Sequence, residues 1–122
     1  MPFEISFHPS WRLAITRAWG QITLDDLLSY RQELAARPEF DPTWSHVFDA
    51  AGAVRFDLSS EEIRHLAATS VLAPSARRAL VATDGAIVGL FRLYGTMFEL
   101  QVDGSAVGVF TTLHEAIEWV TP

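Results

Sequence analysis

The 122-residue sequence contains no cysteine and no lysine, so all nine of its basic side chains are arginine. Without cysteine the chain can form no disulfide and can use no thiolate nucleophile. Without lysine it has neither a Schiff-base amine nor the lysine of a Walker-type phosphate loop. These two absences exclude several classes of covalent and nucleotide chemistry before any motif is considered.

The sequence also has no run of basic residues, and its net charge is −6. Binding to a phosphate backbone depends on a cationic stripe that releases counterions, so we expect no nucleic-acid partner. An anionic membrane surface is disfavoured for the same reason. The start of the chain, MPFEISFHPSW, lacks a basic region followed by an apolar run, and no apolar stretch reaches the roughly 20 residues that span a bilayer. We therefore expect a cytoplasmic protein without a signal peptide or membrane insertion.

Hydrophobic residues make up 49% of the chain and charged residues 20%, which is typical of a globular protein. A chain of this length is about one domain, and we find no repeat, linker or low-complexity segment. The sequence predicts a single domain over residues 1–122.

The spacing of apolar residues predicts strands that alternate with helices. The expected strands cover residues 3–8, 11–19, 45–50, 77–83 and 106–110. The expected helices follow four capping residues, Thr23, Ser59, Asp84 and Thr112, and two of these are followed three residues later by glutamate. Gly20 is expected to end the second strand, residues 51–58 to form a loop, and residues 103–105 a turn.

This order, β-β-α-β-α-β-α-β-α, predicts an α/β fold. A short connection makes the first two strands an antiparallel hairpin, and right-handed crossovers make the later strands parallel. We expect a mostly parallel five-stranded sheet whose antiparallel edge strand is the first one.

Four segments carry a resemblance to a known family: TLDDLLSYRQEL, HVFDAAGAVRFDLSSEEIRHLA, RRALVATDGAIVGLFRLYGTMFE and VFTTLHEAIEWV. Through these segments, nearly the whole chain resembles the STAS domains, which have the fold of bacterial anti-sigma-factor antagonists of the SpoIIAA type. It is also similar to small uncharacterised SpoIIAA-like proteins of bacteria. The resemblance implies a single STAS/SpoIIAA-like domain that works by protein association.

In regulatory members of that family, an Asp-Ser pair opens the second helix, and a partner kinase phosphorylates the serine to switch off binding. Here Asp57 is followed by Leu58, so the position of the family's phosphoserine is not matched. Ser59 and Ser60 lie close to it and are the candidate phosphorylation sites. The other interpretation of Ser59 is a helix cap paired with Glu62, and the acidic residues around it favour the cap over a phosphate.

No motif in the sequence predicts catalysis. Asp49 and Asp84 follow neighbouring strands, but no GxGxxG or GxSxG sequence accompanies them. The histidines, at positions 8, 46, 65 and 114, have no metal-binding spacing. We therefore predict no catalytic residue, no metal and no cofactor. A small enzyme that uses Asp49, Asp84 and a histidine is the third and least favoured hypothesis.

The helix after Asp84 is apolar around most of its circumference, although a helix on one side of a sheet needs only an apolar stripe. Three explanations stay open: a helix covered on two sides within the fold, a dimer or partner face, and the wall of a ligand pocket. The residues that would form the dimer or ligand face are Phe91, Tyr94, Met97 and Phe98.

The leading hypothesis is a non-enzymatic protein-interaction or regulatory domain that binds a protein partner or a second copy of itself. Its surface would combine the expected loop 51–58, the start of the second helix and part of the third helix. The partner-binding residues would be Arg55, Asp57, Ser59, Ser60 and Arg64. The alternative hypothesis is a carrier or sensor of a small apolar or lipid-like ligand.

Overall fold

The computed structural model describes residues 2–102 and 106–121 of the chain. Its strands are β1 (Phe3–His8), β2 (Leu13–Thr23), β3 (Ser45–Asp57), β4 (Arg77–Val81) and β5 (Ala106–Phe110). Its α-helices are α1 (Leu24–Ala36), α2 (Ser60–Ala68), α3 (Gly85–Gln101) and α4 (Leu113–Val120), and a 3-10 turn, Pro9–Trp11, joins β1 to β2.

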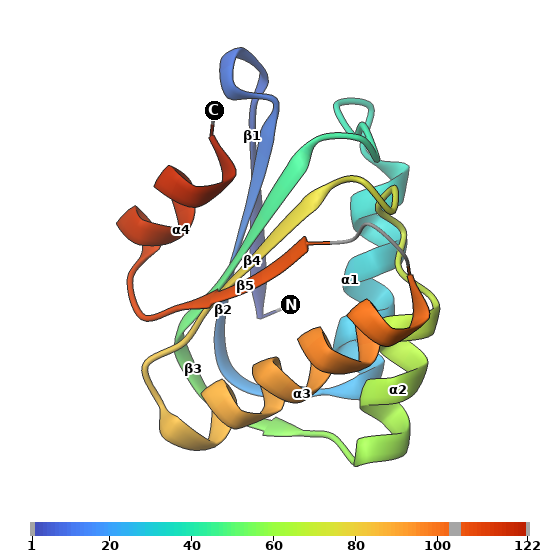
Figure 1. The fold of residues 1–122 in the computed structure, drawn as a ribbon, viewed down its shortest axis with the longest axis vertical. Coiled ribbons are helices and arrows are strands. Elements are labelled where there is room, and N and C mark those ends of the chain that lie inside the picture. Colours follow the sequence, from blue (N-terminus) through green and yellow to red (C-terminus); the bar gives the residue numbers. More distant parts are fainter. Residues whose placement is uncertain (1, 103–105, 122) are drawn as a thin grey trace.

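The strands form one five-stranded sheet in the order β1-β2-β3-β4-β5. β1 pairs antiparallel with β2, and every other pair is parallel, as the sequence predicts. Figure 1 shows α4 on one side of the sheet and α1, α2 and α3 on the other. Because side chains alternate along a strand, each face has its own apolar cluster, and the larger one lies under α1, α2 and α3.

Local sequence signals set the helix starts, and all four predicted caps are confirmed. The Ser59 Oγ accepts a hydrogen bond from the Glu62 N–H at 3.2 Å, and the Glu62 carboxylate accepts one from the Ser59 N–H at 2.8 Å. The Asp84 carboxylate accepts from the first amides of α3. These bonds satisfy amides that have no partner within their helix.

Two strands extend beyond their predicted ends. β2 continues through Gly20 to Thr23, and β3 continues to Asp57 through the segment expected to be a loop. The pairing of these two strands shifts register on either side of Gly20, whose φ of +73° is one that glycine adopts freely. The prediction of a loop at 51–58 is therefore wrong, because pairing with β2 overrides the weak strand preference of the local sequence.

The predicted bounds of two other strand ends differ from the structure by two residues. β4 stops at Val81, two residues before its predicted end, and β2 begins at Leu13, after the 3-10 turn. The turn expected at 103–105 lies outside the described residues. The end of β3 turns toward α3, where the rings of Phe56 and Phe91 have centroids 5.4 Å apart.

Helix α3 buries one stripe completely, and residues beside that stripe are half-buried. Ile87, Phe91, Gly95 and Phe98 form the buried stripe at spacings of three and four residues. Near its end, Leu100 is 82% exposed. No helix in the described ranges is both long enough and apolar enough to span a membrane.

Candidate functional site

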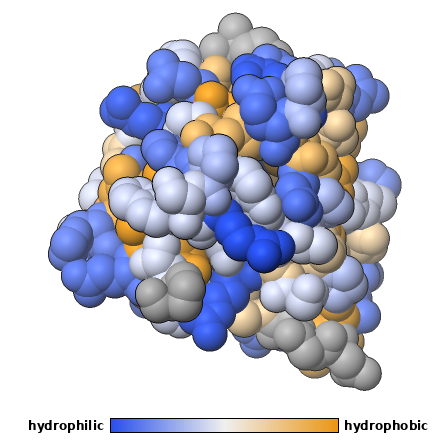
Figure 2. Space-filling model, turned by 90° about the horizontal axis from the view of Figure 1, so that it is seen from above, coloured by the Kyte–Doolittle hydropathy of each residue, from blue (hydrophilic) through white to orange (hydrophobic). Residues whose placement is uncertain are grey.

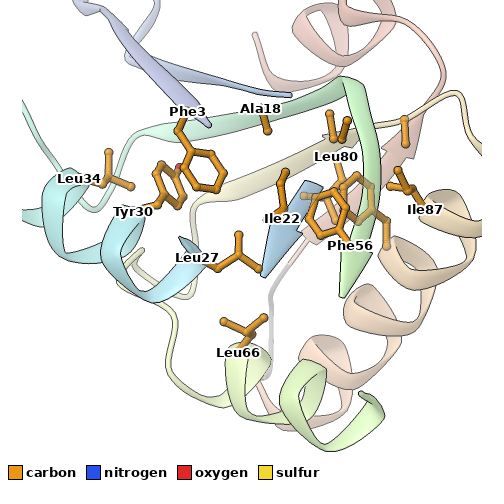
Figure 3. Close-up of a cluster of buried hydrophobic side chains, with 14 residues drawn as sticks. Phe3, Ala18, Ile22, Leu27, Tyr30, Leu34, Phe56, Leu66, Leu80 and Ile87 are labelled. Carbon is orange, nitrogen blue, oxygen red and sulfur yellow. The ribbon is translucent and has the colours of Figure 1, made fainter. Parts of the chain in front are cut away.

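A pocket of about 130 Å³ lies between the sheet and helices α1, α2 and α3. Most of its wall is apolar: Leu27, Leu34, Phe48, Phe56, Leu58, Ile63, Leu66, Val71, Leu72, Ala79, Leu80, Leu90 and Phe91. Its polar lining consists of Tyr30, Arg31, His46, Ser70, Arg78 and Tyr94. Figure 3 shows Leu27 of α1, Leu66 of α2 and Phe56 of β3 converging from three elements.

The lining of this pocket is that of a site for a small molecule, and its volume restricts the ligand to a very small one. Ligand sites in proteins are concave and mainly apolar, with a few polar groups placed among the hydrophobic ones. An apolar cavity of about 150 Å³ is large enough to take up benzene. The pocket can therefore hold the apolar part of a ligand that is about the size of one aromatic ring.

Three polar side chains at the inner surface of the sheet form a closed network. The Tyr30 hydroxyl lies 2.7 Å from Thr16 Oγ1 and 3.0 Å from His46 Nε2, and Thr16 Oγ1 lies 2.9 Å from the same nitrogen. Burial raises the pKa of Tyr30 and lowers the pKa of His46 to about 4, which the nearby Arg78 charge also lowers. Both groups are consequently neutral at pH 7, so they contribute hydrogen bonding without charge.

Arg78 brings a cation into the same interior. Its side chain is 3% exposed, and its guanidinium carbon lies 4.1 Å from the centroid of the Phe98 ring. The two terminal nitrogens donate hydrogen bonds of 2.7–3.2 Å to Ala76 O, Ser70 Oγ, Leu72 O and Ala73 O. The buried Nε–H has no hydrogen-bond partner. Neutral oxygens thus hold the guanidinium in place, but they do not neutralise its charge.

Arg31 is the second cation of the pocket. It is half-buried on α1 and donates to the Leu66 carbonyl at 2.8 Å and to Thr69. No aspartate or glutamate lines the pocket with these two arginines. Burial lowers the pKa of Arg78, Tyr94 opposes this shift, and the positive charge of Arg31 adds to it. The pocket lining therefore contains two cationic side chains and no acidic one, in a protein whose net charge is −6.

The structure brings Arg55 and Asp57, two of the predicted partner-binding residues, into direct contact at the end of β3. Arg55 Nε lies 2.5 Å from a carboxylate oxygen of Asp57, and the Gln21 side-chain amide donates to the other oxygen. The Gln21 hydrogen bond, together with Arg55, lowers the pKa of Asp57. Asp57 is therefore an anion at neutral pH and is held in a fixed position at the surface.

The other three predicted residues follow on α2. Ser59 is occupied as the cap of the helix, and Ser60 is its exposed first residue. Arg64 is exposed and lies 3.5 Å from Glu61 one turn earlier. Their exposure is compatible with partner binding and with phosphorylation, and both remain predictions.

The residues predicted for a dimer or ligand face on α3 divide into two pairs. Phe91 and Tyr94 line the pocket. Phe98 is 1% exposed and packs on Arg78, and Met97 is half-buried; neither lines the pocket. Because Phe91 and Phe98 are both buried in the fold, this set does not form a continuous outer face.

Asp49 and Asp84 have structural partners. The Asp49 carboxylate accepts a hydrogen bond from the Ala51 N–H at 3.0 Å, and Asp84 caps α3. Across residues 2–102 and 106–121, no three histidine or acidic side chains are grouped as metal ligands would be.

Sequence reasoning missed the buried polar residues of the pocket, above all Arg78. One signal was available in the segment RRALVAT. Successive residues of a strand point to opposite faces, so two adjacent arginines in a sheet with helices on both faces must place one side chain under each helical layer. Arg77 is exposed and Arg78 points inward.

The face of the molecule seen in Figure 2 is mostly polar, and hydrophobic residues show between the polar ones in separate groups. The large apolar side chains that the surface does expose, Trp11, Trp19, Val54 and Leu100, belong to different elements.

No protein-family model and no curated protein sequence matches this chain. Among solved structures, it is similar to an uncharacterised protein of the DUF3478 family with a SpoIIAA-like fold, from Shewanella loihica PV-4. The two share 14% sequence identity with a TM-score of 0.60, and the match covers 97% of this chain and 91% of the other. Together with the strand order and the parallel pairing, this match shows that the chain has the SpoIIAA-like fold.

Proposed function

We propose that the chain is a non-enzymatic, cytoplasmic domain that binds a small apolar ligand in the pocket under α1, α2 and α3. The observation that carries this proposal is the pocket itself, about 130 Å³ with a wall drawn from strands β3 and β4 and helices α1, α2 and α3. A packed protein interior has few voids larger than a water molecule, so a space of this size has a cost in lost contacts. An occupant would restore those contacts.

The position of the pocket supports a sensor rather than a simple carrier. Phe56 and Leu58 line the pocket, and Asp57 stands between them in the chain. The Asp57 carboxylate is held outside by Arg55 and Gln21. A ligand that displaces Phe56 or Leu58 would therefore change the position of the surface carboxylate between them.

Titration with indole, a neutral aromatic molecule, tests this proposal. Indole is added to isotope-labelled protein, and the backbone and methyl NMR signals are followed. We expect saturable shifts of Leu66 and Leu80, which line the pocket. The variant Leu90→Phe places a larger side chain at the pocket wall and should weaken binding at least tenfold. Leu100→Phe makes the same exchange at an 82% exposed position of the same helix and should bind as the wild type does.

Two results would contradict ligand binding. One is the absence of saturable shifts up to the solubility limit of indole. The other is equal weakening in Leu90→Phe and Leu100→Phe, which would place the binding outside the pocket.

A second candidate function is association with a protein partner through the surface formed by Arg55, Asp57, Ser59, Ser60 and Arg64. The observation that favours it is Val54, which precedes Arg55 in β3 and is 75% exposed. An exposed valine loses contact with water when a partner covers it, which would contribute to the free energy of association. The two functions are compatible, since Asp57 connects this surface to the pocket wall.

A further inference from the structure

The charge of the pocket restricts the chemistry of its ligand. Two guanidinium groups line it, and no carboxylate does. Among the described residues, neither Arg31 nor Arg78 has an acidic side chain within 4.0 Å. A charge removed from water is costly unless an opposite charge or a full set of hydrogen bonds compensates it. Arg78 has neither, because its Nε–H lacks a partner.

The other polar groups of the pocket cannot supply the missing charge. Burial keeps Tyr30 protonated, and His46 is neutral at pH 7. Ser70 already accepts a hydrogen bond from Arg78 at 3.2 Å. Tyr94 favours the charged form of Arg78, but no group in the lining is a carboxylate. A ligand with a negative group would supply the opposite charge that the lining lacks.

We infer that the ligand is a small organic carboxylate whose negative group faces Arg78 and Arg31 and whose apolar part fills the remaining pocket. This inference rests on the proposed function and adds the chemical class of the ligand. A carboxylate is the anion that a planar guanidinium pairs with best, through parallel charge-assisted hydrogen bonds. The volume limits the apolar part to about one aromatic ring or a short alkyl chain.

Matched probes that differ only in charge test the inference without any mutation. Phenylacetate carries the carboxylate and a phenyl ring, phenylacetamide is its neutral isostere, and acetate is the anion without the ring. Their dissociation constants are measured by NMR titration of the full chain at pH 7. We expect phenylacetate to bind at least tenfold more tightly than either of the other two, with shifts of pocket signals.

Variants then identify the cations responsible. Arg78→Gln should abolish the preference for phenylacetate over phenylacetamide, provided that its NMR spectrum remains that of a folded protein. Arg31→Gln should reduce the preference by about threefold or more, and it serves as the second test if Arg78→Gln does not fold. Arg92→Gln removes the same charge from an exposed position of α3 outside the pocket and should leave the preference unchanged.

The outcomes separate the two proposals. Equal binding of phenylacetate and phenylacetamide in the pocket would overturn the carboxylate inference and leave the proposed function standing. Acetate binding as tightly as phenylacetate would also overturn it, because the apolar part would then contribute nothing. If no aromatic probe binds, including indole, both proposals fail.

Discussion

The hydroxyl of Tyr30 and the Nε2 of His46 are 3.0 Å apart, although 16 residues separate them in the chain. Thr16 completes the network with contacts to both. A neutral imidazole nitrogen either donates or accepts, so the three groups share the two hydroxyl protons and any proton on Nε2. These hydrogen bonds can form while the ring is neutral, and the network contains no anion that would favour a protonated ring.

This network makes stability depend on pH through His46. Its pKa is about 4 in the folded protein and 6.5 in the unfolded chain. Between these values the unfolded chain binds more protons, so the free energy of unfolding falls as pH decreases from 6.5 to 4. The difference in pKa corresponds to a loss of about 3 kcal/mol. Urea unfolding at a series of pH values measures this loss.

The variant His46→Gln is the control, since glutamine can hydrogen-bond but does not titrate. Carboxylates also titrate below pH 5, and the difference between the wild type and His46→Gln isolates the contribution of the histidine. The variant should be less stable at pH 7 and should lose less stability on acidification. If the free energy of unfolding of the two proteins changes with pH in parallel, His46 is not held neutral in the folded protein.

The reciprocal bonds between Ser59 and Glu62 predict the effect of a single hydroxyl. Ser59→Ala removes the acceptor for the Glu62 N–H and should lower the free energy of unfolding by about 1 kcal/mol. Ser60→Ala, one residue along, removes an exposed hydroxyl that caps nothing and should change it by less than about 0.5 kcal/mol. Chemical denaturation measures both. Equal effects of the two substitutions would contradict the cap.

Comparison of these elements shows which features the sequence could predict. The caps at Ser59 and Asp84 depend on residues within three positions of each other, so the local sequence contained the whole signal. The end of β3 and the pocket depend on residues that are far apart in the chain. Thr16 meets His46 over 30 positions, and β3 continues to Asp57 only because β2 lies beside it. Such pairings are set by tertiary structure, which local propensity does not contain.

Gly20 offers a test of the register shift between β2 and β3. Its φ of +73° should cost a residue with a side chain about 1–2 kcal/mol, so Gly20→Ala should destabilise the protein by that amount. Gly89 lies in an ordinary part of α3, and a Cβ there would meet no atom within 4 Å. Gly89→Ala should therefore stabilise the protein by up to about 1 kcal/mol. Thermal unfolding of both variants should give shifts of opposite sign, and a neutral Gly20→Ala would contradict the requirement for glycine at the register shift.

The surface at the end of β3 predicts where a protein partner would bind. Asp57→Ala combined with Ser60→Ala removes the fixed anion and the adjacent hydroxyl, and it leaves Arg55 without its 2.5 Å partner. We expect the double variant to lose a partner that the wild type retains in affinity purification from its own host. Thr96→Ala combined with Glu99→Ala removes a hydroxyl and an anion from exposed positions of α3 and serves as the matched control. The control should retain the partner, since it leaves the β3 surface intact. If the double variant retains every partner of the wild type while its NMR spectrum shows a folded protein, association does not depend on this surface.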